Sequence, residues 1–331
     1  MSSEVYWRIA LSQVQGIGCV GAQALLRHYG SAEAVFEASA VAPGDFAVVE
    51  ATLRFVRQHG VHLWLPGDPE YPRRLLDCPD HPILLYFKGA ANLNRSHVLS
   101  IVGTRTPSDH GKQAVRSLVR ELSAYDVLLV SGLADGIDTL VHRYALEYGL
   151  PTVGVLAHGL DSLYPPTNRH LAEAMLERGG LLTEFAPGTP AIPGHFPVRN
   201  RIVAGIGEAT VIVESRIKGG SMVTAGLARG YQREVFAIPG RITDERSLGC
   251  LALIRGNAAA LVTGGEDVAR MLNWEPTAQK ARKAPSAHPL LALLRDRDSV
   301  HLDELKATSG LTSTELAVAL LTLELEQAID A

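Results

Sequence analysis

The sequence predicts an α/β protein with a doubly wound parallel sheet at its centre and a smaller helical domain at each end. Eight short apolar runs lack the period-two alternation of a half-exposed sheet, as expected for strands buried on both faces. Amphipathic segments of helical period lie between these runs, and this alternation is typical of a parallel sheet covered by helices. The predicted strands are residues 83–87, 98–103, 127–130, 152–157, 181–185, 209–214, 234–238 and 259–263.

Residues 1–65 form the predicted N-terminal domain, in which apolar residues recur at helical spacing. Gly16, Gly18 and Gly21 match the dinucleotide-binding pattern G-x-G-x-x-G, but that motif requires a preceding strand and these residues follow a helical segment. A helix, a Gly-Ile-Gly turn and a second helix instead predict a helix-hairpin-helix. Its amides can contact a phosphate or simply close a tight turn, and both readings stay open.

Residues 66–272 form the predicted central domain. The Pro-, Asp- and Gly-rich stretch around residues 65–82 marks its start, because such a composition is unsuited to the interior of a helix or strand. The helix after the second strand illustrates how the domain is built: Thr106 can cap it and Pro107 suits its first turn. Its apolar stripe faces the sheet and consists of Ala114, Val115, Leu118, Val119 and Leu122.

Residues 273–286 are rich in Pro, Ala and Lys without an apolar face, and we interpret them as a linker. Residues 287–331 return to helical period in short segments that resemble a helix-turn-helix unit, and Thr312 or Ser313 is expected to cap the last helix.

The charge is unevenly distributed. The formal net charge of −4 argues against a basic protein that wraps duplex DNA nonspecifically. Residues 1–94 sum to −2 and residues 271–331 to −3, whereas residues 95–270 hold 18 basic and 17 acidic residues and sum to +1. The central domain therefore carries the positive charge, and many of its arginines follow predicted strands.

Several classes of protein are excluded by what the sequence lacks. Cys19, Cys78 and Cys250 are far apart and form neither a CxxC pair nor a Cys/His cluster, which predicts reduced thiols and no metal site. The first residues lack the apolar run of a signal peptide, and no stretch approaches the roughly 18 apolar residues of a membrane span. We therefore expect a soluble cytoplasmic protein that uses no cofactor and no membrane.

Three predicted strand-to-helix loops carry residue types that bind phosphate. Ligands of open α/β sheets lie beyond the carboxyl ends of the strands, where these loops gather. Arg105 can donate two hydrogen bonds to a phosphate or pair with a neighbouring acid. The Gly/Ser-rich turn at Lys218 directs amides and hydroxyls at one anion, although it is not a Walker loop. The candidates are Gly103, Thr104, Arg105, Ser131, Gly132, Lys218, Gly219, Gly220, Ser221 and Thr224.

The segment FPVRNR adds Arg199, Asn200 and Arg201 to the candidates. The two arginines can form salt bridges to Glu184 or Glu214 as a structural clamp. Equally, they can contact phosphate and a base edge, with Phe196 available for stacking. The residues alone leave both readings open.

No catalytic residue is predicted. Asp135 or Asp138 is expected to cap the following helix; the two have the spacing of a catalytic carboxylate pair, but nothing nearby supplies a nucleophile or a metal set. His158, Asp161 and Ser162 are too close in sequence for a hydrolytic triad, and no G-x-S-x-G elbow exists.

Six motifs taken together in order resemble the DNA-processing protein A (DprA/Smf) family over about residues 65–262. They are VGTRTPSDHGKQAV, SGLADGIDTLVHRYAL, YPPTNRHLAEAM, FPVRNRIVAG, GGSMVTAGLARG and REVFAIPGRITDERSLG. The resemblance implies an extended Rossmann-like core, an N-terminal SAM-like or helix-hairpin-helix domain and a C-terminal winged-helix-like domain. It also implies a homodimer that binds single-stranded DNA without hydrolysing it, at the candidates named above, and loads a RecA-type recombinase in natural transformation.

The chain departs from the family pattern at three places. Gly249 to Ile254 read GCLALI where the family usually has G-T-N-x-L-I, and Pro166 replaces a common lysine. The sequence stops soon after the last predicted helix, so we expect a short or absent β-wing. The net charge of the C-terminal part favours protein contact over duplex binding.

The alternative is an enzyme on a related fold, a nucleotide-processing phosphoribohydrolase. That class would require P-G-G-x-G-T-x-x-E, and the corresponding loop here reads GGSMVTAGL without the glutamate. The sequence therefore favours the binding protein.

Overall fold

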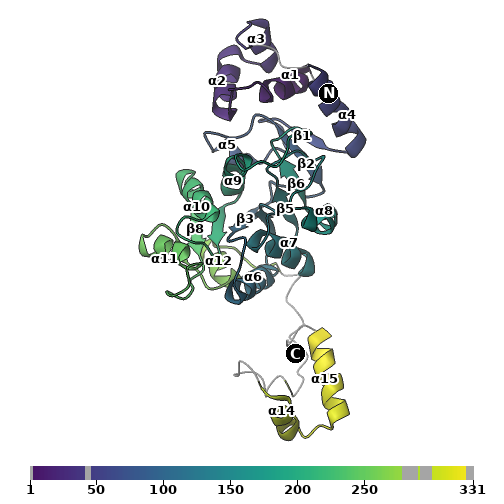
Figure 1. Ribbon diagram of the computed structural model, residues 1–331, viewed down its shortest axis with the longest axis vertical. Helices are drawn as coiled ribbons and strands as arrows, with labels where there is room; N and C mark the ends of the chain where they lie inside the picture. Colours follow the sequence, from purple (N-terminus) through teal and green to yellow (C-terminus); the bar gives the residue numbers. More distant parts are fainter. Residues whose placement is uncertain (1–2, 42–45, 278–289, 291–299, 326–331) are drawn as a thin grey trace. The chain divides into compact units, whose positions relative to one another are not determined.

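The computed structural model describes residues 3–41, 46–277, 290 and 300–325 (Figure 1). The chain divides into two compact units, residues 1–276 and residues 277–331.

The first unit begins with four helices that share one apolar cluster. Gly30, with φ of +85°, ends the second of them in a left-handed conformation that glycine adopts without strain. Ser31 then caps the third by accepting a hydrogen bond from Ala34 N at 3.1 Å. The turn expected at Gly16 and Gly18 does connect two helices. The helices are α1 (Ser3–Ser12), α2 (Cys19–Tyr29), α3 (Ala32–Glu37) and α4 (Phe46–His59).

Within the described residues, nine strands form one sheet in the order β1-β2-β6-β5-β4-β3-β7-β8-β9. All neighbours from β6 to β9 pair in parallel, whereas β1 and β2 are antiparallel to their neighbours. The eight predicted strands are confirmed, and β1 is an addition at the edge. The strands are β1 (His62–Trp64), β2 (Leu85–Gly89), β3 (His97–Val102), β4 (Val127–Ser131), β5 (Thr152–Val155), β6 (Gly180–Thr183), β7 (Ala209–Ile212), β8 (Glu234–Ala237) and β9 (Ala260–Leu261).

Helices cover both faces of the sheet, as the unalternating apolar strands require. Within β3, Val98 and Val102 belong to one apolar cluster, and Leu99 and Ile101 belong to the other. The first cluster includes residues of α5 (Arg73–Leu76), α9 (His195–Ile206), α10 (Gly220–Gly230) and α11 (Leu248–Arg255). The second includes residues of α6 (Asp109–Leu122), α7 (Ile137–Glu147) and α12 (Gly265–Met271). A short 3₁₀ helix, η1 (Pro166–Asn168), precedes α8 (Arg169–Met175).

The predicted cap of α6 is wrong. The N-cap is Ser108, whose Oγ accepts from Gly111 N at 3.1 Å, and not Thr106. The Ser108 N–H and hydroxyl both donate to the buried carboxylate of Glu214, at the end of β7. A partner from another strand therefore decides where the helix begins, which the local sequence does not show.

The second unit contains α14 (Leu302–Ser309) and α15 (Ser313–Leu325), which pack through a leucine cluster. Thr312 caps α15 as predicted: its hydroxyl accepts from Glu315 N at 3.4 Å, and its N–H donates to the Glu315 carboxylate at 2.9 Å. Three parts of the predicted C-terminal region lie outside the described residues. They are the predicted linker from residue 278 on, Leu291 to Leu294, and the residues after Leu325, where a wing would follow.

In the described part of the chain, no helix combines the length and the apolar character needed to cross a membrane.

Candidate nucleic-acid interface

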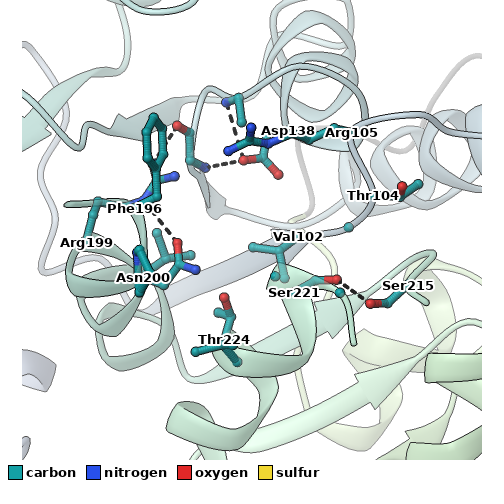
Figure 2. A pocket seen from close by; sticks show the side chains of 18 of the residues that line it. Val102, Thr104, Arg105, Asp138, Phe196, Arg199, Asn200, Ser215, Ser221 and Thr224 are labelled. Atoms are coloured by element: carbon teal, nitrogen blue, oxygen red, sulfur yellow. Dashed lines mark hydrogen bonds between the residues drawn. The ribbon is translucent and has the colours of Figure 1, made fainter. Parts of the chain in front are cut away.

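A crevice of about 750 Å³ opens beyond the carboxyl ends of β3, β4 and β7 (Figure 2). The loop after β3, the loop after β4, the first half of α9 and the β7–α10 turn supply its walls. Eleven of the thirteen candidate residues line it: Gly103, Thr104, Arg105, Gly132, Arg199, Asn200, Lys218, Gly219, Gly220, Ser221 and Thr224. The strand-end argument thus places residues far apart in sequence in one cavity.

Ser131 and Arg201 are not among the residues that line the crevice. The buried Ser131 hydroxyl donates to Ile101 O at 2.6 Å and joins β4 to β3. Arg201 is only 7 % exposed, forms an ion pair with Glu184 and donates to Asp80 O at 2.6 Å. Of the two readings of Arg201, the structure therefore shows the salt bridge to Glu184.

Arg199 lines the crevice but is engaged by the protein itself. Its guanidinium donates to Gly132 O at 2.6 Å and to Val155 O, and thereby ties the ends of β4 and β5 to α9. Burial lowers the pKa of Arg199 to about 10, and the nearby carboxylate of Asp138 opposes that shift. The side chain is therefore a buried cation at neutral pH.

Asp138 compensates this buried charge. Its Oδ2 accepts hydrogen bonds from Gly132 N at 3.1 Å and Ala134 N at 3.4 Å. Burial raises the pKa of Asp138, while Arg199 and the N–H donors oppose the rise. The expected capping role is wrong, because Gly136 is the N-cap of α7 and Asp138 instead holds the preceding loop.

Gly132 explains how so many polar groups fit together. A Cβ at this position would lie 2.6 Å from both the Arg199 guanidinium and the Asp138 carboxylate, closer than non-bonded atoms approach. Only glycine leaves the space that this pair occupies. We call Gly132, Asp138 and Arg199 the crevice floor.

The remaining cations face solvent. Arg105, Arg216 and Lys218 are exposed, and neither Arg105 nor Lys218 forms an ion pair with a described residue. The Arg105 guanidinium lies 5.2 Å from the centre of the Phe196 ring, and Tyr164 meets that ring edge-on at 5.9 Å. We call Arg105, Phe196, Arg216 and Lys218 the crevice rim.

The β7–α10 turn forms the other side of the crevice from Phe196, Arg199 and Asn200 (Figure 2). Gly219 is the N-cap of α10 without a side-chain hydrogen bond; Met222 N donates to Gly219 O at 3.1 Å, so the amides of Gly220 and Ser221 are the ones left for a ligand. The Ser221 hydroxyl donates to Ser215 Oγ at 2.7 Å and fixes the turn.

Several lining residues were not among the candidates, notably Tyr164, Ser215 and Arg216. Arg216 lies only two residues before Lys218, so the basic character of that turn could have indicated it. Tyr164 belongs to an irregular loop, and no local pattern places its ring beside Phe196.

The polar side chains of the loop around His158 form hydrogen bonds that hold this loop and its neighbour in place. His158 Nε2 accepts from Tyr164 N at 3.2 Å, and Asp161 Oδ1 accepts from Gly188 N at 2.8 Å. With Nε2 accepting, His158 Nδ1 carries the proton and donates to Gly159 O at 2.9 Å, so it cannot take a proton from the Ser162 hydroxyl 3.5 Å away. In the part of the chain that the structure describes, no three His, Cys, Asp or Glu side chains form a group that could hold a metal ion.

Comparison with known protein families gives two matches. Residues 62–273 match the family described as DNA recombination-mediator protein A, and residues 275–331 match the DprA winged helix domain. Protein Smf of Synechocystis is 33% identical over 291 residues, which cover 82% of this chain and 73% of that protein. DNA processing protein DprA of Streptococcus pneumoniae is 39% identical over 201 residues, which cover 61% of this chain and 71% of that protein.

The solved structures that are similar to this chain include two of DNA processing protein A. The crystal structure of DNA processing protein A from Streptococcus pneumoniae has a TM-score of 0.71 at 30% identity, covering 84% of this chain and 100% of that one. DNA processing protein A from Helicobacter pylori, whose structure was described for its mode of binding single-stranded DNA, has a TM-score of 0.59 at 27% identity. That similarity covers 65% of this chain and 97% of the other.

Proposed function

Since the chain belongs to the DNA recombination-mediator protein A family, we propose that it binds single-stranded DNA in the crevice described above. By holding the DNA there, the protein protects incoming single strands and loads a RecA-type recombinase during natural transformation. It acts in the cytoplasm as a homodimer. The Helicobacter pylori relative, described as binding single-stranded DNA, supports this choice of ligand.

The observation that carries the proposal is the exposed, unpaired charge of Arg105 and Lys218 in one crevice with an aromatic ring. Cations at the ends of neighbouring strands suit successive phosphates, and the free amides at the start of α10 suit another. Phe196 offers a stacking surface for a base. Phosphate contacts and stacking together favour a single strand, because the bases of a duplex are already stacked on one another.

The crevice supports binding more than bond cleavage. Asp138 is the one carboxylate among its described lining residues, and its Oδ2 already accepts two backbone N–H groups beside Arg199. A phosphoribohydrolase would need a carboxylate free to act on its substrate. The loop at Gly219 to Thr224 contributes none.

Fluorescence anisotropy with labelled oligo-dT tests the binding step. Lys218→Ala should weaken binding about tenfold at low salt and reduce the slope of log affinity against log salt by about 0.7, the value for one phosphate contact on a single strand. Arg229→Ala is the matched control, because Arg229 is an exposed cation at the opposite end of α10. Equal binding by wild type and Lys218→Ala would contradict the assignment of the site.

The loading step needs a second assay. A RecA-type recombinase should form filaments faster on single strands covered by a single-strand-binding protein when this protein is present, measured by the ATPase rate of the recombinase. Release of free base from nucleoside monophosphates by the purified protein would instead support the hydrolase.

A further inference from the structure

We propose that the path of the single strand leaves the crevice over the loop of residues 239–247, between β8 and α11, and that Arg241 and Ile242 bind the DNA there. The inference rests on the proposed function and extends its site. In the sheet, β8 is the next strand after β7, whose following turn forms one wall of the crevice. Neighbouring strands lie about 4.8 Å apart, so the loop after β8 is the next ligand-facing loop in the row.

Contacts on both sides hold this loop against the crevice. On the side of the β7–α10 turn, Arg216 lies 3.6 Å from the Glu245 carboxylate, and just beyond the loop, in α11, Gly249 N donates to Ser215 O at 2.8 Å. On the side of α6, His110 Nε2 lies within hydrogen-bond distance of Pro239 O, at 3.1 Å. Ser215 and Arg216 both line the crevice. The loop therefore continues the surface that the crevice begins.

The acidic residues of this loop have ionic partners, whereas one of its arginines has none among the described residues. Asp244 lies 3.9 Å from Arg246, and Glu245 pairs with Arg216, so each acid has an arginine partner. Arg241 is exposed and forms no ion pair with any described residue. The loop thus offers a further exposed cation that, like Arg105 and Lys218, has no ionic partner among the described residues.

Ile242 follows Arg241 directly and is 80% exposed. A single exposed isoleucine is common on protein surfaces and alone indicates nothing. Next to Arg241, in a loop whose Glu245 pairs with the crevice-lining Arg216, it provides an apolar surface for a base beside a donor for its phosphate. This combination favours a nucleic-acid strand over an acidic peptide, which would use the charge but not the apolar surface.

The experiment compares oligo-dT of two lengths, about 5 and about 15 nucleotides, within the range that single-strand-binding folds cover. In Arg241→Ala/Ile242→Ser, the short oligonucleotide should bind as to wild type, because it occupies only the crevice. The long one should bind about tenfold more weakly, with the salt slope reduced by about 0.7. Both side chains are exposed, so the variant is expected to fold, and Arg229→Ala controls for loss of surface charge.

Two results would overturn the inference while leaving the proposed function intact. Unchanged binding of the long strand would show that the loop does not contact DNA and is free for a protein partner. Equal losses at both lengths would show that the loop supports the crevice and does not extend it. If wild type bound neither length, the proposed function itself would fail, together with the inference.

Discussion

The crevice floor and the crevice rim contain the same residue type in opposite circumstances. Arg199 in the floor is buried, donates to Gly132 O and lies near the buried carboxylate of Asp138. Arg105 and Lys218 in the rim are exposed and have no ionic partner among the described residues. Both groups line the crevice, but Arg199 Nη1 donates to Gly132 O and Val155 O inside the protein, whereas the rim cations Arg105 and Lys218 face solvent.

A position beyond a strand end is therefore not enough to assign a binding role. A buried guanidinium whose donors are used inside the protein organises the loops, whereas an exposed guanidinium keeps its donors for phosphate. We therefore expect changes in the floor to alter stability first and changes in the rim to alter DNA binding first.

The largest effect should come from Arg199→Ala. It leaves the Asp138 carboxylate buried without its compensating cation, and Gly132 O and Val155 O lose a donor. Removing one member of a buried charged pair typically costs about 3–5 kcal/mol in the free energy of unfolding. Urea denaturation of the full chain, followed by circular dichroism, measures the loss.

A second substitution separates stability from binding for this prediction. Arg199→Ala/Asp138→Asn removes the uncompensated charge and should recover part of the lost stability. If Arg199→Ala unfolded like wild type but no longer bound DNA, Arg199 would belong with the rim and the comparison would fail.

A smaller effect, on binding alone, is expected for Phe196→Leu. Leucine keeps an apolar side chain beside Tyr164 but removes the ring that faces Arg105. Stacking of one base on an aromatic ring is worth about 1–3 kcal/mol, so the affinity for oligo-dT should fall about 5- to 150-fold. Phe185→Leu is the matched control, because Phe185 does not line the crevice. An equal loss in the control would assign the effect to general destabilisation.

The smallest effect, counted for a single pH unit, is a pH dependence of the free energy of unfolding that arises at His142. His142 is fully buried on α7, and burial, aided by the charge of Arg199, lowers its pKa to about 3. Its Nδ1 lies 2.7 Å from the Thr152 hydroxyl, which donates to Leu129 O, so the imidazole donates to Thr152 and is neutral. In the unfolded chain its pKa is near 6.5.

Below pH 6.5, His142 is therefore protonated in the unfolded chain, whereas in the folded protein it stays neutral down to about pH 3. The free energy of unfolding should fall through this window by about 1.4 kcal/mol per pH unit from this group. His142→Gln can still donate to Thr152 but does not titrate, and its stability should depend less on pH. If wild type and His142→Gln showed the same slope, the assignment to His142 would be wrong.

The strands were predictable because their signal is local. Runs such as VLLV are apolar at every position, and that pattern in a run of about four to six residues is typical of a strand covered on both faces. The edge strand His62–Trp64 has three residues and adjoins a Pro- and Gly-rich segment, so its pairing with Leu85–Phe87 has no local signal. Likewise, Ser108 rather than Thr106 caps α6 because of Glu214, which lies 106 residues away in sequence.

The loops of the site were predictable for a similar reason, but the roles of the two arginines of α9 were not. Glycine, hydroxyl and cationic residues directly after a strand indicate a ligand-facing edge. Whether Arg199 and Arg201 face that ligand depends on Gly132, Val155 and Glu184, which other elements supply. Burial is a property of the folded chain, and the motif FPVRNR does not encode it.

The close fit at Gly132 also constrains how this protein can change over evolutionary time. Any side chain at position 132 would displace the Arg199 guanidinium and the Asp138 carboxylate, and loss of either charged group would strand the other. We therefore expect the three positions to change together and less often than the rim positions. The rim can exchange one cation at a time, and divergence in DNA-binding strength should therefore accumulate there.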